Sequence, residues 1–417
     1  MPVAFYCRYL RNNLKLRIVM IDVHKITGHQ SKLDTKIFRI QALTPVFIGA
    51  GTNLVKGVDI IEHDGDTVRL DLNKVYQKYI ERDPEGLTSA IEEGDLRNFL
   101  KDEDISGLIE QKFNGKCLGQ ELMDHVKDGF GNPIIPGSSL KGSLKTALMH
   151  SLIEQDQQVK DRYLSYLKNQ KGYPRKKEWA SQELQSALFS KRKSGLKGSN
   201  PNFDIGRVFR TTDAKLNSDD LTIVNTSVLN ITHDGSEWKI LGRGKPKNTN
   251  SLEQATKVSV LGIGIDTEID NIKLSLDHSA FKAINWEDEF GWQTLQNAAN
   301  TLSKELIEHD LEFLEEEASK NQIIDVIEDY KELLDYFDNE IITAKEEGRL
   351  CWIQRLGWGS GWLSMTGMHV DDEHIDDVRD MFNLNPSAEL FPKTRKLVLD
   401  NQSKPHSTMG WILVEEV

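Results

Sequence analysis

Two tryptophans lie among four glycines in the stretch LGWGSGWLSMTG at residues 356–367. Glycine lets another molecule approach the backbone closely, because it has no side chain. Tryptophan rings stack on nucleobases, and the guanidinium of Arg355, just before the stretch, is suited to a phosphate. A tight turn with both tryptophans packed in a core would use the same residues, so both interpretations stay open. The candidate residues are Gly357, Trp358, Gly359, Gly361 and Trp362.

The order of the residues excludes two common phosphate-binding loops. A dinucleotide-binding fingerprint needs GxGxxG between a strand and a helix, whereas residues 357–361 read GxGxG. A Walker loop needs glycine, lysine and then serine or threonine, but SSLKGS at 138–143 places the lysine before the glycine. We therefore expect neither nucleotide cofactor.

A second candidate site lies where IIPGSSLKGSLKTAL, at 134–148, begins a helix. Pro136 interrupts a strand-like segment, and Ser138 or Ser139 is suited to cap the helix. Free amides, hydroxyls and lysines at one helix end would attract an anionic group, although a capped helix with solvated lysines explains the same residues. The candidate ligands are Gly137, Ser138, Ser139, Lys141 and Lys145.

Two further stretches, KRKSGLKG at 191–198 and GRGKPKN at 242–248, are rich in basic residues. They suit a phosphate backbone, and several such stretches in an acidic chain indicate a sorted surface charge. Solvated loops account for each stretch taken alone. The secondary basic contacts predicted here are Lys191, Arg192, Lys193, Arg243 and Lys245.

No catalytic constellation stands out, and neither an HExxH nor a GxSxG signature occurs. The three cysteines form no CxxC pair, so we expect no zinc site, no other metal and no cofactor. Histidines remain as candidates for acid–base chemistry. They are His24, His29, His150 and His233.

Hydrophobic periodicity predicts the elements that position these residues. KIFRIQALT at 36–44 alternates as a strand does, and a buried helical stripe is expected at Leu140, Leu144 and Leu148. RKLVLD and GWILVEE, at 395–400 and 410–416, are typical of a closing hairpin. An acidic helical segment is expected to bury one face made by Ile323, Val326, Ile327, Tyr330, Leu333 and Leu334.

Composition describes a globular chain of more than one domain. Its 417 residues are 38% hydrophobic and 28% charged, with a formal net charge of −13. That charge argues against a protein coated by nucleic acid but allows local basic grooves. The sequence contains no apolar run long enough for a membrane span, and we expect a cytoplasmic protein. We divide the chain into a basic N-terminal extension (1–32), a first domain with helical and basic insertions (33–200), a β-rich region (201–290), an acidic helical segment (291–349) and a glycine-rich loop with a closing hairpin (350–417).

Three stretches in order carry a resemblance to a known family. LTPVFIGAG at 43–51, IIPGSSLKGSLKTAL and RLGWGSGWLSMTG at 355–367 resemble the pattern of the RAMP proteins, the RNA-binding subunits of CRISPR effector complexes. The pairing of the last two, with FDIGRVFRTTDAKL at 203–216, is most similar to the family of fifth Csm subunits of type III-A systems.

The resemblance implies an α+β fold of tandem RRM-like (ferredoxin-like) domains with helical insertions. It implies a non-catalytic subunit that caps the backbone filament, holds the 3′ portion of the CRISPR RNA and assists its maturation in antiviral defence. The implied partners are CRISPR RNA, the other RAMP backbone subunits of the Csm complex and a host nuclease. Neither a membrane nor direct contact with DNA is implied. The glycine-rich loop and the lysine-bearing helix start are the expected RNA contacts.

Two alternatives remain. The first is a metal-independent endoribonuclease that processes CRISPR RNA with one of the histidines named above. The second is an assembly protein that contacts neighbouring subunits and no RNA.

Overall fold

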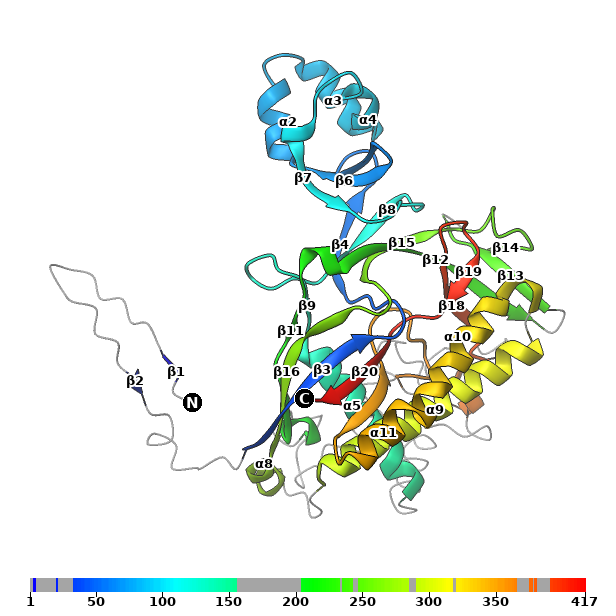
Figure 1. The fold of residues 1–417 in the computed structure, drawn as a ribbon. Coiled ribbons are helices and arrows are strands. Elements are labelled where there is room, and N and C mark those ends of the chain that lie inside the picture. The colour runs from blue at the N-terminus through cyan, green and yellow to red at the C-terminus, as the bar shows by residue number, and fades with distance from the viewer. Residues whose placement is uncertain are drawn as a thin grey trace.

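Two large β-sheets with helices packed against them form the body of the molecule, and a smaller unit stands above it (Figure 1). This arrangement confirms the predicted α+β class. The computed structural model describes residues 33–155, 204–232, 235–242, 247–284, 290–317, 320–365, 375–377, 379–380 and 391–417, together with β1 (Val3–Ala4) and β2 (Met20–Ile21).

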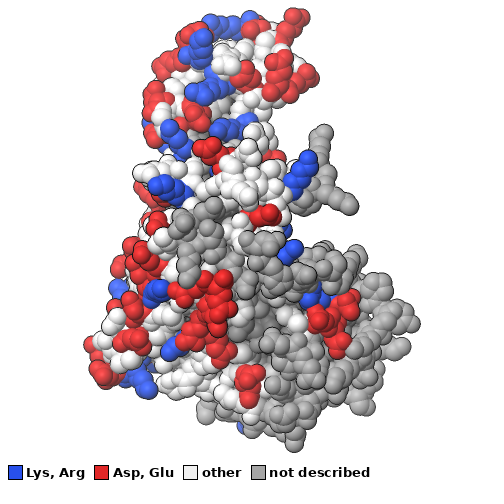
Figure 2. Space-filling model, turned by 90° about the vertical axis from the view of Figure 1, so that its right-hand side faces the viewer, with Lys and Arg blue, Asp and Glu red and all other residues white. Residues whose placement is uncertain are grey.

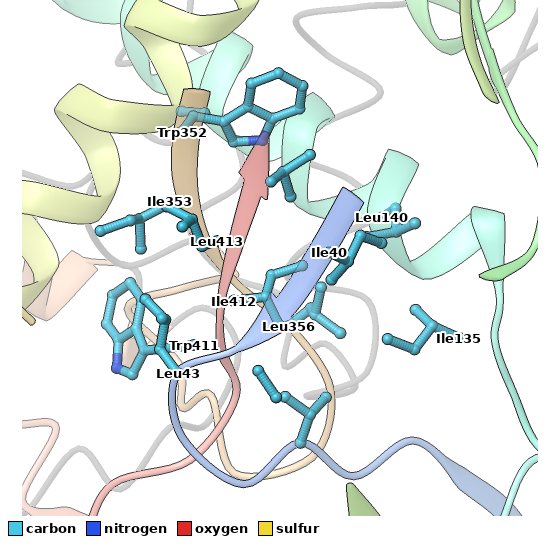
Figure 3. Close-up of a cluster of buried hydrophobic side chains, with 14 of the residues drawn as sticks. Ile40, Leu43, Ile135, Leu140, Trp352, Ile353, Leu356, Trp411, Ile412 and Leu413 are labelled. Atoms are coloured by element: carbon cyan, nitrogen blue, oxygen red, sulfur yellow. The ribbon is translucent and has the colours of Figure 1, made fainter. Parts of the chain in front are cut away.

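The first sheet has five antiparallel strands and one covered face. Phe38 and Ile40 are fully buried, whereas Ile37 before them and Arg39 between them are exposed, so the predicted alternation of the first strand is confirmed. Helices α5 (Gly137–Gln155) and α9 (Trp292–Glu317) pack against this sheet, and Figure 3 shows part of the shared core. The strand order is β10 (Phe209–Thr211), β16 (Glu268–Asp277), β3 (Leu33–Ala42), β20 (Trp411–Glu416) and β17 (Cys351–Arg355).

The second sheet has eight strands and is built around the long strand β12 (Leu221–Thr232). Its main path is β14 (Lys247–Thr249), β13 (Gly235–Ile240), β12, β15 (Val258–Ile263), β8 (Glu121–His125) and β4 (Gly49–Val55). β18 (Thr394–Leu399) pairs with β12, and β19 (Pro405–Ser407) pairs with β18. β18 and β20 therefore lie in different sheets, and the predicted closing hairpin between them is wrong.

The smaller unit has a hydrophobic core of its own, which includes Ile61, Val68, Val75, Leu87 and Leu96. Figure 2 shows basic and acidic side chains interspersed over its surface. It comprises β5 (Ile60–His63), β6 (Asp66–Leu70), α2 (Leu72–Tyr79), α3 (Pro84–Glu93), α4 (Leu96–Phe99), the short 3-10 helix η1 (Ser106–Leu108) and β7 (Ile109–Phe113).

The predicted helical faces are confirmed. Leu140, Leu144 and Leu148 are buried on α5. On α10 (Lys320–Asp338), which packs on α9 and β19, the predicted face is buried, with Leu334 partly so. α11 (Glu340–Glu346) follows α10 and leads to β17. None of the helices in the described ranges combines the length and apolar character needed to cross a membrane.

The start of α5 differs from the prediction. The helix begins at Gly137, so the two serines lie inside its first turn rather than before it. The amide of Gly137 donates a hydrogen bond of 2.8 Å to Oδ1 of Asp213, which belongs to a distant segment. A carboxylate from elsewhere in the chain therefore occupies the helix end, because an exposed amide at that position favours an anion.

Candidate nucleic-acid interface

The glycine-rich loop leaves the end of β17 and passes against the chain that follows β3. The amide of Trp358 donates to the carbonyl oxygen of Phe47 at 2.8 Å. Gly357 has φ +83°, and a Cβ atom there would lie 2.4 Å from the same oxygen. Only glycine fits both the positive φ and the close approach, which explains its presence at this position.

The same loop also contacts α5. Oγ of Ser143 donates a hydrogen bond of 2.9 Å to the carbonyl oxygen of Arg355. The three stretches that carry the sequence resemblance thus meet at one place in the fold, since Phe47, Ser143 and Arg355 belong to one stretch each.

Arg355 lies under the loop and takes part in a buried ion network. The residue is 8% exposed, and its Nη1 lies 3.1 Å from Oδ2 of Asp310 on α9. Nε of Arg395 donates to the other oxygen of Asp310 at 2.9 Å. Burial opposes ionisation of Asp310, but the Arg395 and Arg355 guanidinium groups outweigh it and hold the pKa of this carboxyl well below its usual range.

Arg355 also donates to the carbonyl oxygen of Met409 and to Oγ1 of Thr408, at 2.9 and 2.8 Å. Its donors are directed at protein groups, so in this geometry it braces the loop. A direct contact between Arg355 and a phosphate stays a prediction of the sequence.

A groove of about 530 Å³ runs along the glycine-rich loop and faces β18. Among the described residues that line it, five side chains are basic and one is acidic: Lys239, Arg355, Lys393, Arg395 and Lys396, with Asp310. Gly357, Gly359 and Gly361 line it together with both loop tryptophans and Phe391. Cations beside accessible aromatic rings and bare backbone are the combination that binds single-stranded nucleic acid.

Both tryptophans line the groove while packing against other groups. Trp358 packs edge-on against Phe47, with ring centroids 6.1 Å apart, and Nζ of Lys396 lies 4.5 Å from the Trp358 ring centroid. Trp362 packs against Phe391, with centroids 4.9 Å apart. Each ring is therefore partly buried, in line with the core interpretation, and also borders the groove. Stacking of either ring on a nucleobase stays a prediction.

The lysines of the groove are held close to other cations. Burial lowers the pKa of Lys239, and the nearby charge of Lys393 lowers it further. Burial likewise lowers the pKa of Lys396, with a further contribution from Arg355. Among the described residues, no carboxylate contributes to either shift, so an incoming phosphate would stabilise the charged forms of Lys239 and Lys396.

The residues at the start of α5 are not part of the groove. Successive residues of a helix are turned by about 100°, so Lys141 and Lys145 lie across the helix from Ser143. Nζ of Lys145 lies 2.6 Å from Oδ2 of Asp204, and Nζ of Lys141 lies 5.7 Å from the Phe209 ring centroid. Asp204 is the N-cap of η4 (Ile205–Arg207), and Phe209 is the first residue of β10. The predicted anion site at this helix start therefore stands apart from the glycine-rich loop.

Several predicted residues lie outside the described part of the chain: Lys191, Arg192, Lys193, Arg243, Lys245, His24, His29 and His233. His150 is described; it is 2% exposed, and its Nε2 lies 2.6 Å from Oε2 of Glu305. Within the described ranges, no group of three or more His, Cys, Asp or Glu side chains is arranged to hold a metal ion.

The sequence and the fold of this chain are similar to those of known proteins. A family model described as the RAMP superfamily matches residues 39–364. This chain belongs to the RAMP superfamily. A curated relative from Streptococcus thermophilus, described as CRISPR system Cms protein Csm5, is 29% identical over 146 residues. The match covers 29% of this chain and 40% of that relative, so it spans less than half of the relative's length.

Two solved structures are similar along almost the whole chain. One is the cryo-EM structure of a Csm–crRNA–target RNA ternary complex in a type III-A CRISPR–Cas system; it matches with a TM-score of 0.62 and 18% identity, covering 91% of this chain and 100% of that one. The other is the crystal structure of T. onnurineus Csm5, with a TM-score of 0.59 and 17% identity, covering 90% and 99%. These findings confirm the resemblance to RAMP proteins and to Csm5, and at this identity the structures establish likeness of fold.

Proposed function

We propose that this chain is the CRISPR RNA-binding subunit that caps the backbone filament of a type III-A effector ribonucleoprotein. In this role it holds the 3′ portion of the CRISPR RNA in the groove beside the glycine-rich loop and assists maturation of that end. Its partners are then CRISPR RNA and the RAMP backbone subunits, and a host nuclease performs the trimming. The setting is antiviral defence in the cytoplasm.

One observation carries the proposal: the three family stretches meet beside a groove lined by five basic side chains and two tryptophans. Binding of a phosphate backbone to such a cluster of cations is favoured by the release of counterions. Nucleobases of any identity can stack on the tryptophan rings. RAMP membership and the likeness to Csm5 support the same role. An acidic chain that carries a basic groove suits a subunit that holds a short segment of RNA and meets proteins elsewhere.

The test is to purify the tagged full-length protein from its native host and to sequence the RNA and identify the proteins that accompany it. We expect short RNAs that share a repeat-derived 3′ end, together with other Csm subunits. If Csm subunits co-purify but this chain retains no RNA once it is separated from them, the pure assembly role would be favoured. Absence of both RNA and Csm subunits at low salt would refute the proposal.

A further inference from the structure

The loop between β8 and β9 (Ile134–Ile135) carries the most exposed aromatic side chain of the described chain. Phe130 is 94% exposed, and the loop projects from the body (Figure 1). A phenyl ring exposed to this extent adds almost nothing to the core of the chain and is available to a partner.

The turn that carries Phe130 is braced by its own hydrogen bonds. The Asp128 carboxylate accepts from the amides of Phe130 and Asn132 at 2.8 and 2.9 Å, and from the Asn132 side chain at 3.0 Å. The backbone of Asp128 also accepts from Gly131 and donates to Asn132, at 3.1 and 2.8 Å. The phenyl ring is therefore presented on a fixed backbone, and little conformational entropy remains to be lost when it binds.

The surroundings of Phe130 favour a nucleobase over an apolar protein pocket. Gly129, Gly131 and Asn132 beside it are all exposed, so no apolar surface surrounds the ring and both of its faces are accessible. Lys215, exposed on β11 (Ala214–Lys215), pairs in register with Ile134, which lies four residues after Phe130 at the end of this loop. A flat ring with a solvated lysine nearby matches base stacking combined with a phosphate contact.

We propose that Phe130 is a second RNA contact, separate from the groove, at which the ring stacks on an unpaired base and Lys215 contacts an adjacent phosphate. The inference rests on the proposed function, since the ligand is the same single-stranded RNA. The segment that leads into this loop contacts the chain just before β4, where the amide of Val126 donates to the carbonyl oxygen of Ile48 at 2.9 Å. The neighbouring residue Phe47 contacts the glycine-rich loop.

Substitutions at Phe130 separate stacking from simple hydrophobic contact. The full-length protein would be titrated against a fluorescein-labelled single-stranded RNA of mixed sequence, with Phe130→Ala, Phe130→Leu and Phe130→Trp compared. Because a base–aromatic stack corresponds to about a fivefold to 150-fold change in affinity, we expect both Ala and Leu to weaken binding by about fivefold or more. Trp should bind at least as tightly as Phe. Tyr76→Ala, which removes another exposed aromatic ring from the small unit, is the matched control and should leave affinity unchanged.

The outcomes distinguish this inference from the function on which it rests. Wild-type protein that binds RNA while Phe130→Ala binds equally well overturns the stacking site and leaves the proposed function standing. Full affinity in Phe130→Leu overturns stacking in favour of a hydrophobic contact. Wild-type protein that binds no RNA, with or without the Csm subunits, overturns both. Unchanged melting temperatures would show that the variants fold, as expected for so exposed a residue.

Discussion

Neutralising the groove lysines should change how RNA binding responds to salt. In the triple variant Lys239→Gln, Lys393→Gln, Lys396→Gln, three cations that line the groove lose their charge. Each phosphate neutralised on a single strand contributes about 0.7 to the slope of log affinity against log salt. If each lysine meets one phosphate, the slope becomes shallower by about 2. Between 50 and 200 mM salt the variant would then lose about 20-fold less affinity than the wild type.

Fluorescence anisotropy with labelled single-stranded RNA, at four or more salt concentrations, measures this slope directly. The matched control changes the net charge equally on the small unit, with Lys74→Gln, Lys101→Gln and Lys112→Gln, because all three side chains are exposed there. The control slope should equal that of the wild type. An unchanged slope in the groove variant, or an equal change in both variants, would refute the assignment of the groove as the RNA path.

Three further predictions concern the loop and the network beneath it. Gly357→Ala and Gly361→Ala both place a side chain at positive φ, at a cost of about 1–2 kcal/mol. We expect Gly357→Ala to destabilise more, because its Cβ would lie 2.4 Å from the Phe47 carbonyl oxygen, whereas a Cβ at Gly361 would face open space. Equal denaturation midpoints for the two variants would contradict this. Asp310→Asn leaves two buried arginines without their carboxylate and should cost about 3–5 kcal/mol in chemical denaturation, so a loss below about 1 kcal/mol would be inconsistent with a structural network. Burial raises the pKa of Asp329 to about 6, so the folded state holds this proton to higher pH than the unfolded chain does. The stability contributed by the protonated carboxyl is therefore lost as the pH rises from about 4 to about 6. Asp329→Asn should remove this pH dependence from melting temperatures recorded across that range.

The sequence predicted local elements well because their signals are local. The leucine stripe of α5 and the alternation in β3 depend on periodicity within a single segment, and both are confirmed. The glycines of the loop were also interpretable from sequence, because a missing side chain has the same meaning wherever the chain goes. What approaches Gly357, the Phe47 carbonyl, was visible only in the fold.

Charged residues were harder to interpret, since their role depends on distant partners. Arg355 has the sequence signature of a phosphate ligand, yet its carboxylate partner Asp310 lies 45 residues earlier in the chain. Asp310 belongs to an acidic helix, and nothing in the sequence distinguishes it from the other carboxylates of that helix. Sequence reasoning missed Lys239, Lys393 and Lys396, which reach one groove because β13 and β18 both pair with β12. The pairing of β18 with β12, whose partners lie more than 150 residues apart in the chain, is set by tertiary packing and leaves no local signal in either strand.

The small unit and its separate core were missed for a similar reason. Its helices are short and polar on most of their surface, so the sequence predicts one domain at 33–200 and no separate unit within it. The hydrophobic residues that join them, such as Leu87 and Leu96, contribute to one core only once β5, β6 and β7 form a sheet.

The most direct test of the account is to locate the RNA on the protein by ultraviolet cross-linking of the complex purified from its host, followed by mass spectrometry of the cross-linked peptides. We expect cross-links on the peptides that contain Trp358, Trp362 and Lys396, all of which line the groove. Efficient cross-linking of CRISPR RNA to this chain at other peptides, with none in residues 355–365 or 391–396, would contradict the central claim that the glycine-rich groove holds the RNA.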